Sequence, residues 1–235
     1  MRIFEILSEA EGKHVAFTFG RMNPPTVGHE ALLNATENAG RDYKIFLSQT
    51  QDAKKNPLDY QTKIKFIKMM FPEHANNIIV DPNLNTVMKV ASYLYDLGYR
   101  NATFVAGSDR LDAMAQLLKQ YNGVEGKSHG FYNFDMLDFK SSGEREDGAE
   151  GVSGVSATMA RSAAANGDFE AFKEATGAGQ YAQDLFNAVR AGMGIKEDAA
   201  GVGIVTKQNA TADVPVGGEY MNVRKLFPKK KKTSK

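Results

Sequence analysis

One ten-residue segment combines an imidazole, a hydroxyl, two prolines and two glycines. Residues 20–29 are GRMNPPTVGH, between the β-forming run HVAFTF and the helix-patterned run EALLNATENA. Backbone N–H groups at a helix start lack partners within the helix and carry the positive end of its dipole, so they stabilise an anion. The two prolines restrict the backbone, and Gly28 lets a ligand approach it closely. The segment therefore predicts a phosphate site that the side chains of Thr26 and His29 face.

Two later segments carry polar groups suited to the same task. Ser156, Thr158 and Arg161 belong to VSATMAR at 155–161, where two hydroxyls open a predicted helix and a guanidinium follows. An arginine can bind two oxygens of one phosphate at once, which a lysine cannot do. The segment GSD at 107–109 directly follows an apolar strand, ATFVA. Both segments are thus predicted to contribute to a site for a polyphosphate.

Together these segments resemble the signatures of the nucleotidylyltransferase superfamily, whose members are relatives of class I aminoacyl-tRNA synthetases. GRMNPPTVGH resembles the (H/T)xGH motif, VSATMAR resembles the (I/V)SxTxxR motif, and GSD resembles the turn after the fourth strand. The resemblance covers residues 13–190. Thr26 stands where many relatives have a first histidine, and phosphopantetheine adenylyltransferases are similar in having threonine there.

The resemblance implies transfer of AMP from ATP, or of CMP from CTP, to a phosphomonoester, with Mg²⁺ as cofactor and pyrophosphate as the second product. In such a reaction an acceptor oxygen attacks the α-phosphorus directly, so the protein positions the substrates and neutralises charge. Catalytic roles are expected for Thr26, His29 and Arg161. The residues expected to bind the nucleotide are Gly20, Arg21, Asn23, Gly28, Lys54, Lys55, Gly107, Asp109, Ser156 and Thr158.

Some of these assignments have a structural alternative. Thr26 either hydrogen-bonds a phosphate oxygen or caps the helix, and Asp109 either contacts ligand or magnesium or caps the next helix. Lys54 and Lys55 either reach a phosphate or stay solvated. His29 is expected to donate to the α-phosphate through a ring N–H that imidazole has in both protonation states. The residues do not distinguish adenine from cytosine.

The elements that must position these residues alternate between strand and helix. Strands are predicted at 14–19, 43–47, 77–80, 102–106 and 131–139. Helices are predicted at 30–39, 60–71, 86–97, 109–121, 158–166, 169–175 with Asp168 as N-cap, and 181–191. The order is typical of an α/β fold, a Rossmann-like three-layer α/β/α sandwich with a parallel sheet and a C-terminal helical segment. Its ligand crevice lies at the carboxyl ends of the strands.

Length and composition favour one nucleotidylyltransferase domain over 1–193, followed by an extended or disordered basic tail over 194–235. The chain has 235 residues, of which 42% are hydrophobic and 24% charged, as in ordinary globular proteins. It has no cysteine, so any metal needs oxygen or imidazole ligands, and magnesium is expected. Without a signal-peptide pattern or a long apolar run, a cytoplasmic protein without membrane contact is expected. Residues 141–153 are expected to form a loop or a lid.

The C-terminal end suggests a second hypothesis. Residues 224–235 hold seven of the 29 lysines and arginines and no acid, which suits a solvated end or an arm for a polyanion. MRIFEILSEA and IVTKQNATADV resemble terminal segments of tailed-bacteriophage proteins, and LSEA at 7–10 resembles a head-protease cleavage pattern. The alternative is therefore a non-catalytic nucleotide-binding protein that docks through its tail on nucleic acid or a phage assembly, in the host cytoplasm.

Overall fold

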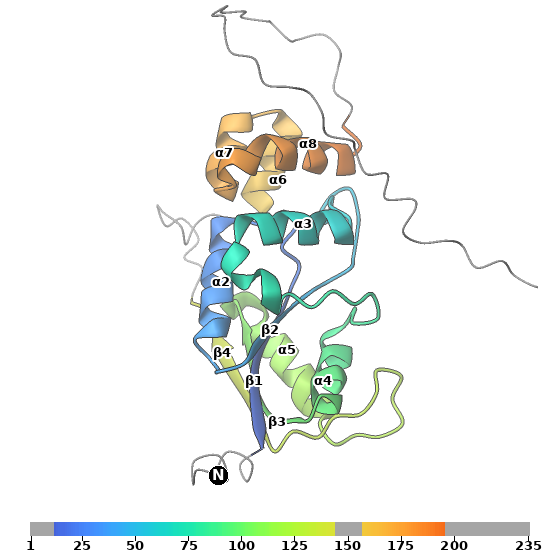
Figure 1. Cartoon of the computed structure of the whole chain (residues 1–235). Helices are drawn as coiled ribbons and strands as arrows, with labels where there is room; N and C mark the ends of the chain where they lie inside the picture. Colours follow the sequence, from blue (N-terminus) through green and yellow to red (C-terminus); the bar gives the residue numbers. More distant parts are fainter. Residues whose placement is uncertain (1–11, 144–156, 196–235) are drawn as a thin grey trace, which may run out of the picture. The chain divides into compact units, whose positions relative to one another are not determined.

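The structure, a computed structural model, describes residues 12–143 and 157–195 (Figure 1). Its strands form one parallel sheet in the order β2-β1-β3-β4. The strands are β1 (Lys13–Gly20), β2 (Tyr43–Leu47), β3 (Tyr99–Ala106) and β4 (Met136–Ser141). Aromatic and β-branched residues are frequent in β1 and β2, as expected for buried strands. The predicted α/β fold with a parallel sheet is confirmed.

Helices cover both faces of this sheet, so the predicted three-layer sandwich is confirmed as well. Ala16 packs in a cluster with α2 and α3, whereas Val15 and Phe17 pack in another with α4 and α5. Consecutive strand residues point to opposite faces, which explains this division. Figure 1 shows α2 and α4 on opposite sides of the sheet. The helices are α2 (Val27–Glu37), α3 (Tyr60–Met70), α4 (Val87–Asp96) and α5 (Ser108–Tyr121).

The strand predicted at 77–80 is wrong. The 3₁₀ helix η1 (Pro72–Asn77) occupies the start of this segment, and Ile78 forms only an isolated parallel bridge with Ile45 of β2. The Ile79 N–H donates to the Ile45 carbonyl at 3.0 Å. Pro82, which lacks an N–H, follows shortly afterwards. The segment therefore lies beside β2 but is too short to extend the sheet.

The fifth predicted strand is displaced along the chain, because β4 starts at Met136 rather than at residue 131. Tyr132 is fully buried, and its hydroxyl donates to the Leu118 carbonyl at 3.0 Å. The Phe134 N–H donates to the Asn122 side chain at 2.9 Å. Polar groups of the apolar segment before β4 are thus paired by these hydrogen bonds rather than by a neighbouring strand. Apolar character alone therefore located the core contact correctly but not the strand.

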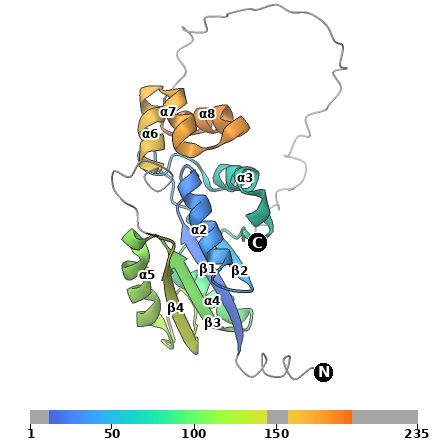
Figure 2. The ribbon, with the colours of Figure 1, turned by 90° about the vertical axis from the view of Figure 1, so that its left-hand side faces the viewer.

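The C-terminal helical segment comprises α6 (Ala157–Asn166), α7 (Phe169–Thr176) and α8 (Ala182–Gly192), with the 3₁₀ turn η2 (Gly179–Tyr181) between the last two. The predicted cap of α7 is confirmed, because the Asp168 carboxylate accepts a hydrogen bond from the Ala171 N–H at 3.0 Å. Apolar residues of these helices form a third cluster that includes Leu58 and Phe66. Figure 2 shows the three helices grouped next to α3. Helix α3 thus packs on the sheet with one face and on the helical segment with another.

Two glycines allow the C-terminal helices to approach the rest of the fold closely. A Cβ atom at Gly192 would lie 2.1 Å from the Pro57 carbonyl oxygen, and one at Gly177 would lie 2.1 Å from Val27 Cγ1. Gly177 also has a φ of +62°, in the left-handed region that ends α7. The helical segment is therefore held against the start of α2 and the loop after β2.

The chain divides into compact units 1–197 and 198–235, and the second unit lies outside the described residues. The same is true of the expected loop or lid from residue 144 onward, of Ser156, and of the expected basic tail from residue 196 onward. Within the described ranges, no helix is both long enough and apolar enough to cross a membrane.

Candidate functional site

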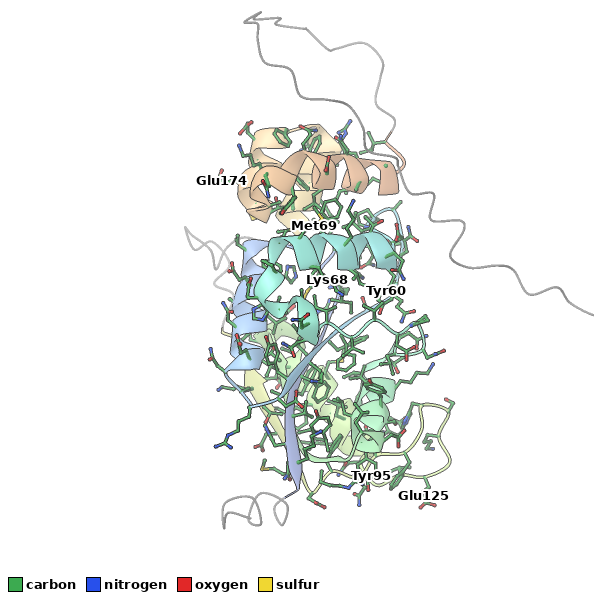
Figure 3. The ribbon with its side chains drawn as sticks, viewed as in Figure 1. Tyr60, Lys68, Met69, Tyr95, Glu125 and Glu174 are labelled. Carbon is green, nitrogen blue, oxygen red and sulfur yellow. The ribbon has the colours of Figure 1, made fainter. Side chains whose placement is uncertain are left out.

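A cavity of about 400 Å³ lies where β1, β3 and β4 end and where α2, α5 and α6 begin. This is the edge of a parallel sheet at which ligands bind in open α/β folds. Figure 3 shows Tyr95 and Glu125 at the other end of the sheet. The cavity brings together predicted residues from four separate segments of the chain: Gly20, Arg21, Asn23, Gly28, His29, Lys55, Gly107, Asp109, Thr158 and Arg161.

His29 is held by a bond that selects one form of its ring. It is the third residue of α2, and its Nδ1 accepts a hydrogen bond from the Thr26 backbone N–H at 3.0 Å. A backbone N–H can only donate, so Nδ1 carries no proton and the ring proton resides on Nε2. His29 is 9% exposed and lines the cavity. The arrangement resembles a capping box, in which the third helical residue bonds back to the N-cap.

Thr26 does not line the cavity. It is the N-cap of α2 and is 1% exposed, and its Oγ1 lies 2.9 Å from His29 Nδ1. Of the two roles considered for Thr26, the structure therefore favours capping and positioning of the imidazole over direct contact with a phosphate.

Asn23 joins the loop after β1 to two distant parts of the fold. Its side-chain amide donates to the Leu58 carbonyl at 2.9 Å and accepts from the Leu58 N–H at 3.0 Å. Its backbone carbonyl accepts a hydrogen bond from Arg161 Nη1 at 2.8 Å. With both ends of its amide occupied, Asn23 borders the cavity mainly as a scaffold.

Arg161 reaches the cavity from α6, one turn after that helix begins. Its Nη2 donates to Thr158 Oγ1 at 2.9 Å, which fixes the guanidinium plane together with the bond to Asn23. Burial lowers the pKa of Arg161, and the neighbouring charge of Arg21 lowers it further. A partly buried guanidinium with a second cation near it favours a bound anion.

The charge of the cavity lining is unbalanced. Arg21, Lys55, Arg110 and Arg161 contribute four cationic groups, and Asp109 is the sole acidic lining residue in the part of the chain that the structure describes. Asp109 Oδ2 lies 3.8 Å from Arg110 Nε. Net positive charge, combined with three helix starts, is the environment that a polyphosphate requires.

The two candidate lysines after β2 differ in position. Lys55 lines the cavity and Lys54 does not. The Asp52 carboxylate accepts hydrogen bonds from both backbone N–H groups, at 2.6 Å from Lys55 and 3.0 Å from Lys54. These bonds, with that from Asn56, lower the pKa of Asp52 and fix the loop. The loop therefore contributes one of the two candidate lysines, Lys55, to the cavity lining.

Asp109 is not the N-cap of α5, because Gly107 occupies that position and Asp109 is the second residue of the helix. Its carboxylate is thus available to the cavity rather than used in capping. The described residues contain no group of three or more His, Asp or Glu side chains arranged to hold a metal ion. One carboxylate beside a polyphosphate is a common donor set for Mg²⁺, which takes most of its other ligands from phosphates and water.

Several lining residues were not predicted. Arg110 follows the GSD turn directly, and this position is the one sequence signal that could have identified it. A lone arginine belongs to no recognisable motif. Ala31 and Leu32 of α2 and Thr18 of β1 have ordinary core-forming sequence patterns. Ser142 and Gly143 enter the lining because β4 ends there, later than the predicted strand.

A buried lysine lies outside the cavity lining. Lys63 of α3 is 0% exposed, and its ammonium group donates to the carbonyl of Ser48, the residue after β2. Burial lowers its pKa to about 8, and the charge of Asp59 opposes that shift. The Ser48 N–H in turn donates to the Gly20 carbonyl at 2.9 Å. Lys63 therefore supports the end of β1 through Ser48 and does not itself line the cavity.

No protein-family model, no curated protein and no solved structure matches this chain. The resemblance to nucleotidylyltransferases thus stays a prediction from the three sequence motifs.

Proposed function

We propose that the protein is a nucleotidylyltransferase, which transfers AMP or CMP from ATP or CTP to a phosphomonoester and releases pyrophosphate. The observation that carries this proposal is the convergence of His29, Arg161 and three helix starts on one positively charged cavity. A cytoplasmic location, where nucleoside triphosphates are abundant, fits the same proposal.

In the proposed reaction an oxygen of the acceptor phosphate attacks the α-phosphorus of the triphosphate. A new P–O bond forms to the acceptor, the bond from the α-phosphorus to the bridging oxygen breaks, and its electron pair leaves with pyrophosphate. His29 Nε2–H donates to an α-phosphoryl or bridging oxygen, where negative charge increases in the transition state. The fixed tautomer means that this donor needs no protonation of the ring.

The remaining residues act on the leaving group and the nucleotide. Arg161 and Thr158, at the start of α6, bind the β- and γ-phosphates, and Arg21 and Lys55 neutralise further charge. Asp109 would hold a Mg²⁺ ion together with phosphate oxygens, and the ion would supply charge neutralisation. Thr26 acts through His29 rather than on the substrate.

The test is product formation from ATP and from CTP, each with Mg²⁺ and a panel of phosphomonoesters. We expect pyrophosphate with one triphosphate and a small set of acceptors, and its loss on addition of EDTA. Binding of a triphosphate without pyrophosphate from any acceptor would instead favour the non-catalytic alternative. That alternative involves the tail at 224–235, which is outside the described residues.

A further inference from the structure

One hydroxyl group of the cavity lining has no hydrogen-bond partner among the described residues. Thr18 of β1 lines the cavity and is 1% exposed. Its Oγ1 is buried and makes no hydrogen bond with any described residue. Most buried polar groups in folded proteins are paired, so an unpaired one calls for a specific explanation.

Packing does not explain a threonine at this position. The neighbouring strand residues Phe17 and Phe19 are apolar, and a valine has the same branched shape and an equal preference for strands. A valine would also remove the free-energy cost of burying an unpaired hydroxyl. The hydroxyl is therefore a cost to the free protein, and a bound ligand is the natural source of the missing partner.

The position of Thr18 indicates which part of a ligand it faces. The groups that favour phosphate lie at helix starts or in loops, after the strands have ended. Thr18 instead lies two residues before the end of β1, and the lining residues Ala31 and Leu32 of α2 lie two and three residues after His29. This part of the cavity lining carries no charge, so it suits the uncharged portion of a ligand.

We propose that Thr18 is a specificity-determining residue that hydrogen-bonds the nucleoside portion of the bound triphosphate. The proposal rests on the proposed function, because it assumes a nucleotide in this cavity. A hydroxyl can donate or accept, so it can pair with a polar atom of the base or the ribose. A change between staggered χ1 rotamers turns the hydroxyl toward the ligand. A buried group that lacks its partner then discriminates strongly against ligands that cannot pair with it.

The experiment compares Thr18→Val with the wild-type chain by calorimetry, using ATP, CTP and inorganic tripolyphosphate as probes. We expect the triphosphate that the wild type prefers to bind about tenfold more weakly to the variant. Tripolyphosphate, which lacks a nucleoside, should bind equally to both. Thr18→Ser, which restores a hydroxyl, should recover most of the nucleotide affinity, and the melting temperature of Thr18→Val should be equal to that of the wild type or higher.

Thr103 provides the matched control. It is a buried threonine on the neighbouring strand β3, its hydroxyl pairs with the His14 ring at 3.0 Å, and it does not line the cavity. Thr103→Val should lower stability and leave nucleotide affinity unchanged.

Two results would overturn the proposal about Thr18 and leave the proposed function intact. One is that Thr18→Val binds ATP and CTP as tightly as the wild type does, while substitution of Arg161 weakens the binding of both nucleotides. The other is an equal loss of tripolyphosphate affinity, which would place the hydroxyl at the phosphates. Failure of the wild type to bind either nucleotide would overturn both proposals together.

Discussion

The starts of α2 and α6 contribute the two principal groups of the candidate site, but they are held in place in different ways. At α2, His29 is fixed by Thr26, three residues earlier in the same motif. At α6, Arg161 donates to the carbonyl of Asn23, 138 residues away. The first arrangement is local and the second is tertiary. A change near α2 should therefore act on one side chain, whereas a change in the packing of α6 should act on the whole anion site.

The two helix starts also differ in the chemistry that their side chains can perform. A single N–H of fixed tautomer at His29 suits charge that appears only in the transition state. The guanidinium of Arg161, with the Thr158 hydroxyl beside it, suits charge that is present in the bound triphosphate. The α2 start is expected to govern turnover, and the α6 start is expected to govern affinity.

The largest expected effect is that of His29→Ala. Turnover should fall about 100- to 1,000-fold, because a transition-state donor is lost, while the dissociation constant of the triphosphate changes by less than about threefold. Pyrophosphate release and calorimetry measure the two quantities. His14→Ala is the control, since His14 pairs with Thr103 and lies outside the cavity lining. Equal losses of turnover and affinity in His29→Ala would contradict the expectation that the α2 start governs turnover and the α6 start governs affinity.

The second effect concerns α3, which packs on the sheet and on the C-terminal helical segment. Lys63 has a pKa of about 8 in the folded protein, whereas the unfolded chain keeps its proton to about pH 10.5. Between these values the unfolded state binds more protons, so the free energy of unfolding should rise with pH. Lys63→Met should abolish that rise, because the variant has no ammonium group to lose its proton.

Denaturant unfolding at pH 7 and pH 10 measures the effect of Lys63. The control is Lys65→Met, which removes an exposed lysine from the same helix and should change neither stability nor its dependence on pH. A wild-type stability that falls between pH 8 and pH 10, with no difference from Lys63→Met, would contradict the assignment of a buried ammonium.

A smaller effect is expected for Arg161→Lys. A two-oxygen contact becomes a point contact and the bond to the Asn23 carbonyl is lost, so the triphosphate should bind about tenfold more weakly. Turnover at saturating substrate should change less. Arg190→Lys is the matched control, because Arg190 donates to the Ala164 carbonyl at 2.7 Å and does not line the cavity. Unchanged affinity in Arg161→Lys would exclude this arginine from the site.

The smallest effect is expected for Thr26→Val, which removes the hydroxyl beside His29 Nδ1 and keeps the backbone bond and the branched shape. Turnover should fall about threefold to tenfold with little change in affinity, and Thr26→Ser should restore it. A loss of triphosphate affinity larger than the loss of turnover would show that Thr26 contacts phosphate after all.

Local pattern predicted most of the elements that carry the site. The alternation in β1 and the apolar spacing in α3 reflect burial against one sheet, and both elements were placed within a residue or two of their observed bounds. The errors occurred where tertiary contacts replaced local ones. Ile78 forms a single isolated bridge with β2, and Tyr132 and Phe134 pack in the core without being part of a strand.

The candidate site shows the same division. Gly28 and His29 line the cavity as predicted, because their positions depend on a strand-to-helix turn within one short segment, whereas Thr26 from the same segment caps α2 and does not line it. Arg110 and Thr18 were not predicted, because their importance depends on which cavity they line. Lys54 and Lys55 were indistinguishable in sequence, and they differ in the structure because Lys55 lines the cavity and Lys54 does not.

The sequence by itself determined the alternating elements, the α/β class and the local cap that orients His29, because these depend on residues at most a few positions apart. The tertiary structure alone decided that Arg161 approaches Asn23, that Lys63 is buried against the Ser48 carbonyl and that Thr18 Oγ1 is left without a hydrogen-bond partner among the described residues. The first two outcomes depend on how α3 packs against the sheet and how the C-terminal helices pack against α3. Packing of that kind is set by contacts between residues distant in the chain, which no short pattern records.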